Sequence, residues 1–113
     1  MSLTEAGGAL TKTPQNVVVL RGEDALLHCS TNATTGGNSI TWYYDHDIIT
    51  HRPCTSQATG FVTSTPDLPT YATQCNLRAL GTRQDGISGA YRCDDLSPSS
   101  AVAMVIVLGE WCY

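Results

Sequence analysis

The stretch ISGAYRC, residues 87–93, decides the fold of this chain when it is taken together with two residues upstream. It ends at Cys93, and Tyr91 lies two positions before that cysteine. Cys29 precedes Cys93 by 64 residues, and Trp42 follows Cys29 by 13. A cysteine, a tryptophan and a second cysteine preceded by a tyrosine are, in this order, typical of a domain made of two packed β-sheets.

The chain around these residues is predicted to be all-β, because short extended runs alternate with turn residues and no window shows a helical stripe. The expected strands span residues 17–20, 25–29, 40–44, 74–80, 90–94 and 101–108. Further short strands are expected within residues 51–73, which are rich in Thr, Ser, Pro and Gly. Residues 1–14 are predicted to be a weakly patterned leader, and residues 110–113 a tail.

This pattern resembles the immunoglobulin superfamily, and within it the V-type (V-set) domains, over about residues 16–109. The resemblance implies an antiparallel two-sheet β-sandwich in which a Cys29–Cys93 disulfide joins the sheets and Trp42 packs against it. It also implies that Tyr91 forms a tyrosine corner. The length between Trp42 and the strand at 74–80 leaves room for the C′ and C″ strands of V-type domains, and one domain is expected to fill residues 1–113.

Two departures narrow the resemblance. The family's usual Asp six positions before the second cysteine is Ile87 here, and the nearest acid is Asp85, so the Arg–Asp salt bridge at the base of the sandwich is not expected. A Phe-Gly-x-Gly bulge is missing from the last strand, and the connection at residues 95–100 is short. These features argue against an antibody-like domain, and the sequence looks more like invertebrate or early-chordate V-type immune or adhesion receptors.

Composition excludes several other classes. With 14% charged and 42% hydrophobic residues, the chain of 113 residues is able to form a packed core. The net charge is −4, and the six Lys and Arg residues are scattered, so nucleic acid is not an expected partner. No apolar run of ~18 residues predicts a membrane span in this fragment, and no secretion signal opens it.

The five cysteines favour an oxidising compartment, because no pair has the C-x-x-C spacing of a zinc or redox motif. We therefore expect an extracellular protein, either secreted or the ectodomain of a cell-surface protein. Asn32-Ala33-Thr34 is an N-glycosylation acceptor in a polar stretch, residues 30–39, that is predicted to be an exposed loop.

The remaining cysteines leave alternatives open. Cys54 and Cys75 enclose 21 residues and are a candidate second disulfide, although sequence does not prove connectivity. Cys112 is then left over in the tail. It is a candidate for an interchain disulfide, for a bond to a further segment, for an artefact of cloning or for a free thiol without a role.

Catalysis and cofactor binding are not expected. Asp45, His46, Asp47 and His51 form the one stretch that resembles metal ligands. Neighbouring side chains on a strand point to opposite faces, so these four do not converge without an irregular turn, and no metal is predicted. No Gly-rich phosphate loop and no nucleophile motif such as G-x-S-x-G is present. A metal-assisted enzyme using His46 and His51 is kept as a contrasting hypothesis.

The strand at residues 101–108 carries the sharpest functional signal, because it is apolar at both parities. Strands of a sandwich normally alternate between a core face and a solvated face. Alignment with the end of V-type domains puts Ala103, Val105 and Val107 inward. The reversed parity exposes these residues instead, and in either case an apolar strip faces away from the core. The expected binding face, on the sheet that the family calls GFCC′, comprises Tyr43, Asp45, Arg92, Asp94, Val102, Met104 and Ile106.

These features predict an extracellular recognition or adhesion domain of an immune-type receptor that binds protein through this sheet, most simply as a homodimer. The alternative is an innate receptor domain that binds a microbial or glycan ligand through the loops at residues 30–39 and 94–100.

Overall fold

The computed structural model describes residues 9–33, 39–64, 73–95 and 100–109. These residues form β1 (Leu10–Lys12), β2 (Val17–Leu20), β3 (Ala25–Leu27), β4 (Ser30–Thr31), β5 (Thr41–Tyr44), β6 (Asp47–Ile48), β7 (Thr50–His51), β8 (Thr55–Ser56), β9 (Phe61–Ser64), β10 (Asn76–Ala79), β11 (Gly89–Asp94) and β12 (Ser100–Leu108). Among the residues described, no helix is long and apolar enough to cross a membrane. The predicted all-β class is confirmed.

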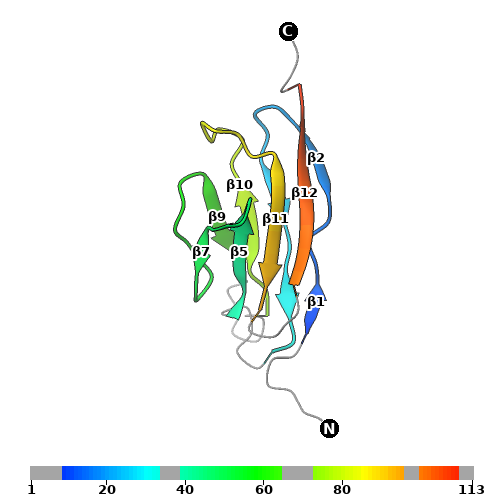
Figure 1. Ribbon diagram of the computed structural model, residues 1–113, viewed down its shortest axis with the longest axis vertical. Coiled ribbons are helices and arrows are strands. Elements are labelled where there is room, and N and C mark those ends of the chain that lie inside the picture. The colour runs from blue at the N-terminus through cyan, green and yellow to red at the C-terminus, as the bar shows by residue number, and fades with distance from the viewer. Residues whose placement is uncertain (1–8, 34–38, 65–72, 96–99, 110–113) are drawn as a thin grey trace.

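Two main sheets make the sandwich. One has five strands in the order β2-β12-β11-β5-β6, and the other has three in the order β3-β10-β9. Pairing is antiparallel within both sheets except between β2 and β12, which run parallel. Figure 1 shows β2, β12, β11 and β5 side by side along the long axis of the molecule. Two further pairs, β1 with β4 and β7 with β8, form small separate sheets.

The core lies between the two main sheets and follows the two-residue period of the strands. Ala25 and Leu27 of β3 are buried, whereas Leu26 between them is exposed. The same alternation buries Tyr91 and Cys93 in β11. Trp42 is fully buried, and its indole nitrogen donates a hydrogen bond of 2.8 Å to the Cys75 carbonyl. The indole therefore fills the space between the sheets without losing its hydrogen bond.

Two disulfides link segments that are distant in the sequence. Cys29 is bonded to Cys93, which links β11 of the five-stranded sheet to the segment that follows β3. Cys54 is bonded to Cys75, so the candidate pairing of these two cysteines is confirmed. The two bridges are neighbours, because the Cys75 amide donates to the Cys29 carbonyl at 2.9 Å. On the chain-entropy estimate they contribute about 4 and 3 kcal/mol respectively.

The tyrosine corner is present. The Tyr91 hydroxyl donates to the Ile87 carbonyl at 2.7 Å, four residues upstream. Burial, together with the neighbouring Tyr44, raises the pKa of Tyr91 far above its ordinary value. Tyr44 and Phe61 pack beside it with ring centroids 4.7 and 6.1 Å from the Tyr91 ring.

The connection between β10 and β11 contains Arg83 and Ile87. Ile87 is buried there, and Arg83 stacks over Phe61 with its guanidinium carbon 5.0 Å from the ring centroid. Its Nη1 donates to the Gly86 carbonyl at 2.6 Å. The Arg83 guanidinium therefore has a backbone carbonyl and an aromatic ring as its partners.

The N-terminal prediction was wrong in part. Residues 1–14 were expected to be a leader, but β1 lies within them and pairs with β4. The expected strand at 25–29 is broken, since β3 ends at Leu27 and β4 begins at Ser30. Ser30 and Thr31 are buried rather than in an exposed loop. Pairing with β1 places Ser30 and Thr31 in a two-stranded sheet rather than in a solvent-exposed loop.

The middle of the chain is also displaced from its prediction. Strands were expected within residues 51–73, whereas β6 and β7 begin earlier, at Asp47 and Thr50. The later strand β9 pairs with β10 and so belongs to the three-stranded sheet. Residues 65–72 lie outside the part of the chain that the structure describes.

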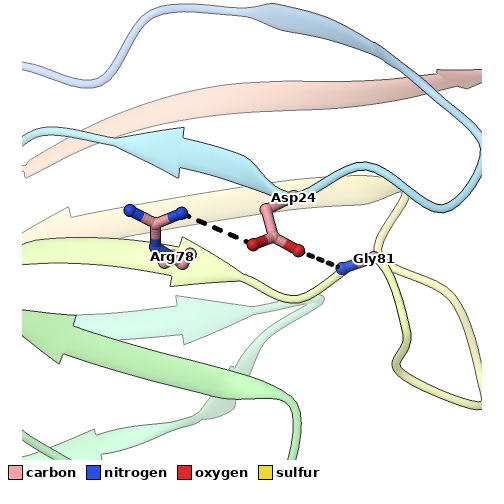
Figure 2. Close-up of polar contacts among 3 residues, drawn as sticks. All are labelled: Asp24, Arg78 and Gly81. Atoms are coloured by element: carbon pink, nitrogen blue, oxygen red, sulfur yellow. Dashed lines mark hydrogen bonds and ion pairs between the residues drawn. The ribbon is translucent and has the colours of Figure 1, made fainter.

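Asp24 fixes one end of the three-stranded sheet. Figure 2 shows its carboxylate between the Arg78 side chain and the Gly81 amide. The amide donates to Oδ1 at 2.8 Å, and Arg78 Nη1 lies 3.4 Å from Oδ2. Asp24 directly precedes β3, whereas Arg78 and Gly81 lie in and just after β10. One side chain therefore joins the start of one strand to the end of its neighbour.

Candidate protein-binding face

A continuous apolar strip covers one edge region of the five-stranded sheet. In β12, Ala103 and Val105 are 1% exposed, and the residues that alternate with them point to solvent. The register places Val18 beside Ile106 and Leu20 beside Leu108, so β2 extends the same face. We call Val18, Leu20, Val102, Met104, Ile106 and Leu108 the outer strip.

Exposed apolar surface is concentrated on this sheet. Nine large hydrophobic residues among those described are exposed, and six of them form the outer strip with exposed fractions between 42% and 60%. Ile48 of β6 lies on the same face, because it pairs with Tyr43. Leu26 and Val62 lie on the other sheet. Isolated exposed hydrophobics are ordinary, but a contiguous group marks an interaction surface.

A polar and aromatic region continues the face beside the strip. The register aligns Ile48, Tyr43, Arg92 and Val102 in one row across four strands. Arg92 lies flat on Tyr43, with its guanidinium carbon 4.0 Å from the ring centroid. Tyr43, His46, Ala90, Tyr91, Arg92 and Val102 line a shallow hollow of about 80 Å³ here. A partner side chain that enters it would meet an aromatic ring, a cation and a valine.

Arg92 and Asp94 form a partly buried pair on this face. Arg92 Nε lies 3.5 Å from Asp94 Oδ2 but makes no hydrogen bond. Burial raises the pKa of the Asp94 carboxyl, and Arg92 offsets part of that rise. Arg92 and Asp94 have already lost part of their hydration in the free domain. Covering the pair with a partner therefore adds a smaller desolvation free energy.

Asp45 is the site residue whose predicted place was wrong. It was expected on the outward face of β5, but it lies in the turn between β5 and β6 with φ of 48°. Its Oδ1 accepts a hydrogen bond from the Ala90 amide at 3.2 Å. The strand ends at Tyr44, so the alternation that predicted an outward side chain no longer applies. Asp45 supports the hairpin, and its neighbour His46 lines the hollow instead.

The other sequence candidates do not form a second site in the described part of the chain. No three His, Cys, Asp or Glu side chains come together there as metal ligands; His46 lies in the turn between β5 and β6, whereas His51 is the last residue of β7. Asn32 is exposed, and its Oδ1 accepts a hydrogen bond of 2.6 Å from the Ala9 amide. The centres of both predicted binding loops, residues 34–38 and 96–99, and Cys112 lie outside the described residues.

Sequence reasoning missed half of the outer strip's extent. Val18, Leu20 and Leu108 belong to it, and Ile48 extends the face. A signal was present, because residues 17–20 read VVVL and are apolar at both parities, as residues 101–108 are. Val18 and Leu20 join the outer strip only through the parallel β2–β12 pairing, which sequence alone did not show.

No family model and no curated protein sequence matches this chain. Solved structures do. The crystal structure of titin domain I10 covers 88% of this chain and 96% of its own, at 16% identity and a TM-score of 0.66. Titin I81 covers 93% and 99%, at 19% identity and a TM-score of 0.68. Titin M4 gives the same coverages at 14% identity and a TM-score of 0.68.

The fold and these likenesses define the class: the chain is an immunoglobulin-like β-sandwich domain. At such identities the likeness concerns the fold alone. Domains of this architecture commonly act through contacts with other proteins.

Proposed function

We propose that this chain is a V-type immunoglobulin recognition domain of an extracellular immune-type receptor or adhesion protein, and that it binds protein through the outer face of its five-stranded sheet. The outer strip is the observation that carries the proposal. Its rows of apolar side chains are flat, contiguous and flanked by Tyr43, Arg92 and Asp94, which is the arrangement of an interface core with a polar rim. The role is one of binding, without catalysis or cofactor.

A second copy of the chain is the simplest partner. A two-fold axis brings a surface against its own equivalent, so one apolar strip on each chain is sufficient for both sides. The strip and the hollow lie side by side on one face, and a two-fold axis near Val102 places the strip of each copy over the hollow of the other. Tyr43, stacked under Arg92, is the side chain that we expect to contribute most to binding.

The V-type assignment has support in the strand order. V-type domains add C′ and C″ to the sheet that contains strands G, F and C. Here β6 joins β5 at the edge of the five-stranded sheet, and the β7–β8 hairpin follows it before β9 enters the other sheet. We assign this hairpin to the C′–C″ connection of the V-type pattern.

An extracellular location agrees with the two disulfides, which persist in oxidising surroundings. Asn32 is the proposed glycosylation site. Its hydrogen bond to Ala9 uses the side-chain oxygen, so the amide nitrogen that would carry the sugar remains available. Asn32 follows β4 of the small β1–β4 sheet, whereas the outer strip lies on β2 and β12 of the five-stranded sheet.

The test is the oligomeric state of matched variants. Met104→Asp or Ile106→Asp places a charge in the strip without touching the core, so each is expected to give a folded monomer at tens of micromolar, where the wild type is a dimer. Val62→Asp is the control, because Val62 is equally exposed at 47% but lies on the opposite sheet. Light scattering with and without reductant separates noncovalent dimers from Cys112-bridged dimers. A monomeric wild type would refute homodimerisation.

The loop-binding alternative has one supporting observation. The Thr31 hydroxyl donates to the buried Asp95 carboxylate at 2.7 Å, which ties the bases of the two loops together. A joined pair of loops is a suitable platform for a microbial or glycan ligand. Ligand capture that survives Ile106→Asp but is lost on loop substitution would favour this function.

A further inference from the structure

The backbone of β2 shows which of its groups face away from the sheet. The Arg21 amide donates to the Leu108 carbonyl at 3.0 Å, so Arg21 points its backbone groups toward β12. Backbone groups along a strand alternate between its two sides. Val19 and Val17 therefore also face β12, whereas Leu20 and Val18 present their N–H and C=O groups at the free edge.

Glu23 forms hydrogen bonds with both backbone groups that Leu20 presents at the free edge. Its Oε1 accepts a hydrogen bond from the Leu20 amide at 2.9 Å, and its own amide donates to the Leu20 carbonyl at 2.9 Å. Both backbone groups of Leu20 are thus satisfied by one residue, which also brings a carboxylate to the edge. Upstream, Pro14 has no N–H to offer.

We infer that Glu23 closes the β2 edge of the five-stranded sheet against addition of another strand, so that association through this sheet uses its outer face. The sequence VVVL of β2 is uncharged, rich in β-branched residues and free of proline, which is the composition of an aggregation-prone edge. An incoming strand has to bond both Val18 and Leu20 to align in register. Because both backbone groups of Leu20 are already hydrogen-bonded to Glu23, Val18 is the one residue of β2 that still offers its backbone groups at this edge. The opposite edge strand, β6, is only two residues long.

The experiment compares three substitutions in the full chain. Glu23→Ala removes the carboxylate acceptor and its charge, and we expect assemblies larger than those of the wild type together with at least a tenfold faster exchange of the Leu20 amide. Glu23→Gln retains the acceptor without the charge, and its exchange and assembly are expected to stay close to those of the wild type. Val18→Pro added to Glu23→Ala removes the outward N–H of Val18, which an edge strand tolerates, and leaves only that of Leu20. This double variant is expected to suppress the new assemblies.

The background variant Ile106→Asp separates this inference from the proposed function. Assemblies of Glu23→Ala that persist in that background form through the edge, as inferred, whether or not the wild type is a dimer. Assemblies that disappear in that background would show that they form through the outer strip and would overturn the inference. The inference would also be overturned if Glu23→Ala assembled like the wild type and exchanged its Leu20 amide at the wild-type rate. Circular dichroism and the melting temperature confirm that each variant is folded.

Discussion

Gly81 is required to be glycine because neighbouring backbone atoms approach it closely, and not because of its own backbone dihedral angles. A Cβ at this position would overlap the Gly22 carbonyl and the Glu23 oxygen, all of them backbone atoms that cannot rotate away. The approach is close because Asp24 holds the Gly81 amide against the turn before β3, as Figure 2 shows. Gly22, in contrast, has open space around it but a φ of 91°.

The two glycines therefore predict different costs. Gly81→Ala is expected to lower the free energy of unfolding by about 3 kcal/mol or more, because the backbone has to move apart. Gly22→Ala is the matched control, and its left-handed conformation alone predicts a loss of about 1–2 kcal/mol. Urea denaturation of both variants measures the difference. Equal losses would mean that the contact at Gly81 relaxes without cost.

At the scale of an element, the hairpin between β5 and β6 contains two consecutive non-glycine residues in the left-handed region. Asp45 has φ of 48° and His46 has φ of 75°, which is the signature of a type I′ turn. Asp45 gains a hydrogen bond to Ala90 in return. His46 lines the hollow of the proposed binding face, so its strain is located at a candidate functional site.

Replacement of His46 in this turn by glycine is expected to increase the stability of the domain and to weaken its binding. His46→Gly relieves left-handed strain of about 1–2 kcal/mol and adds back chain entropy of about 0.5–1 kcal/mol, so a net gain of about 0.5 kcal/mol is expected. Asp45→Gly, the control, loses the bond to Ala90 and is expected to be destabilised. Thermal unfolding ranks the two, and self-association reports on the hollow. A destabilised His46→Gly would show that the imidazole contributes packing that outweighs the strain.

Prediction of the elements succeeded where apolar alternation was strong. Residues 17–20 match β2 in full, and the strands expected at 90–94 and 101–108 differ from β11 and β12 by one residue each. Prediction failed for β1 and for the expected strand at 25–29, because both depend on a pairing between distant segments that carry little hydrophobic signal. Asp45 was misplaced for a related reason, since nothing in the local pattern marked Tyr44 as the last residue of the strand.

At the scale of the whole molecule, the buried Tyr91 phenol makes stability depend on alkaline pH. In the unfolded chain a tyrosine titrates near pH 10, whereas in the folded domain burial raises the pKa of Tyr91 well above that value. Below pH 10 both states hold the proton, and the contribution is fully present. Above it the unfolded state loses the proton first, so stability falls as pH rises.

We therefore expect the free energy of unfolding to decrease above pH 10 by up to about 1.4 kcal/mol per pH unit from this group. Other groups titrate in the same range, so the comparison is with Tyr91→Phe. That variant lacks the hydroxyl bonded to Ile87 and is expected to be less stable by about 1 kcal/mol at neutral pH, with a shallower alkaline slope. Identical slopes from denaturant titrations at pH 9–11 would contradict the assignment.

The sequence alone determined the sandwich, the Cys29–Cys93 bridge and the apolar character of residues 101–108, because these follow from local period, residue type and a distinctive spacing. Tertiary structure decided which face of β12 is exposed, how far the outer strip extends and how its edge is closed. The parallel register of β2 arises only when segments far apart in the chain are brought side by side, and the hydrogen bonds between Glu23 and Leu20 close an edge only because β12 pairs with the other side of β2. Local sequence patterns carry no information about such contacts between distant segments.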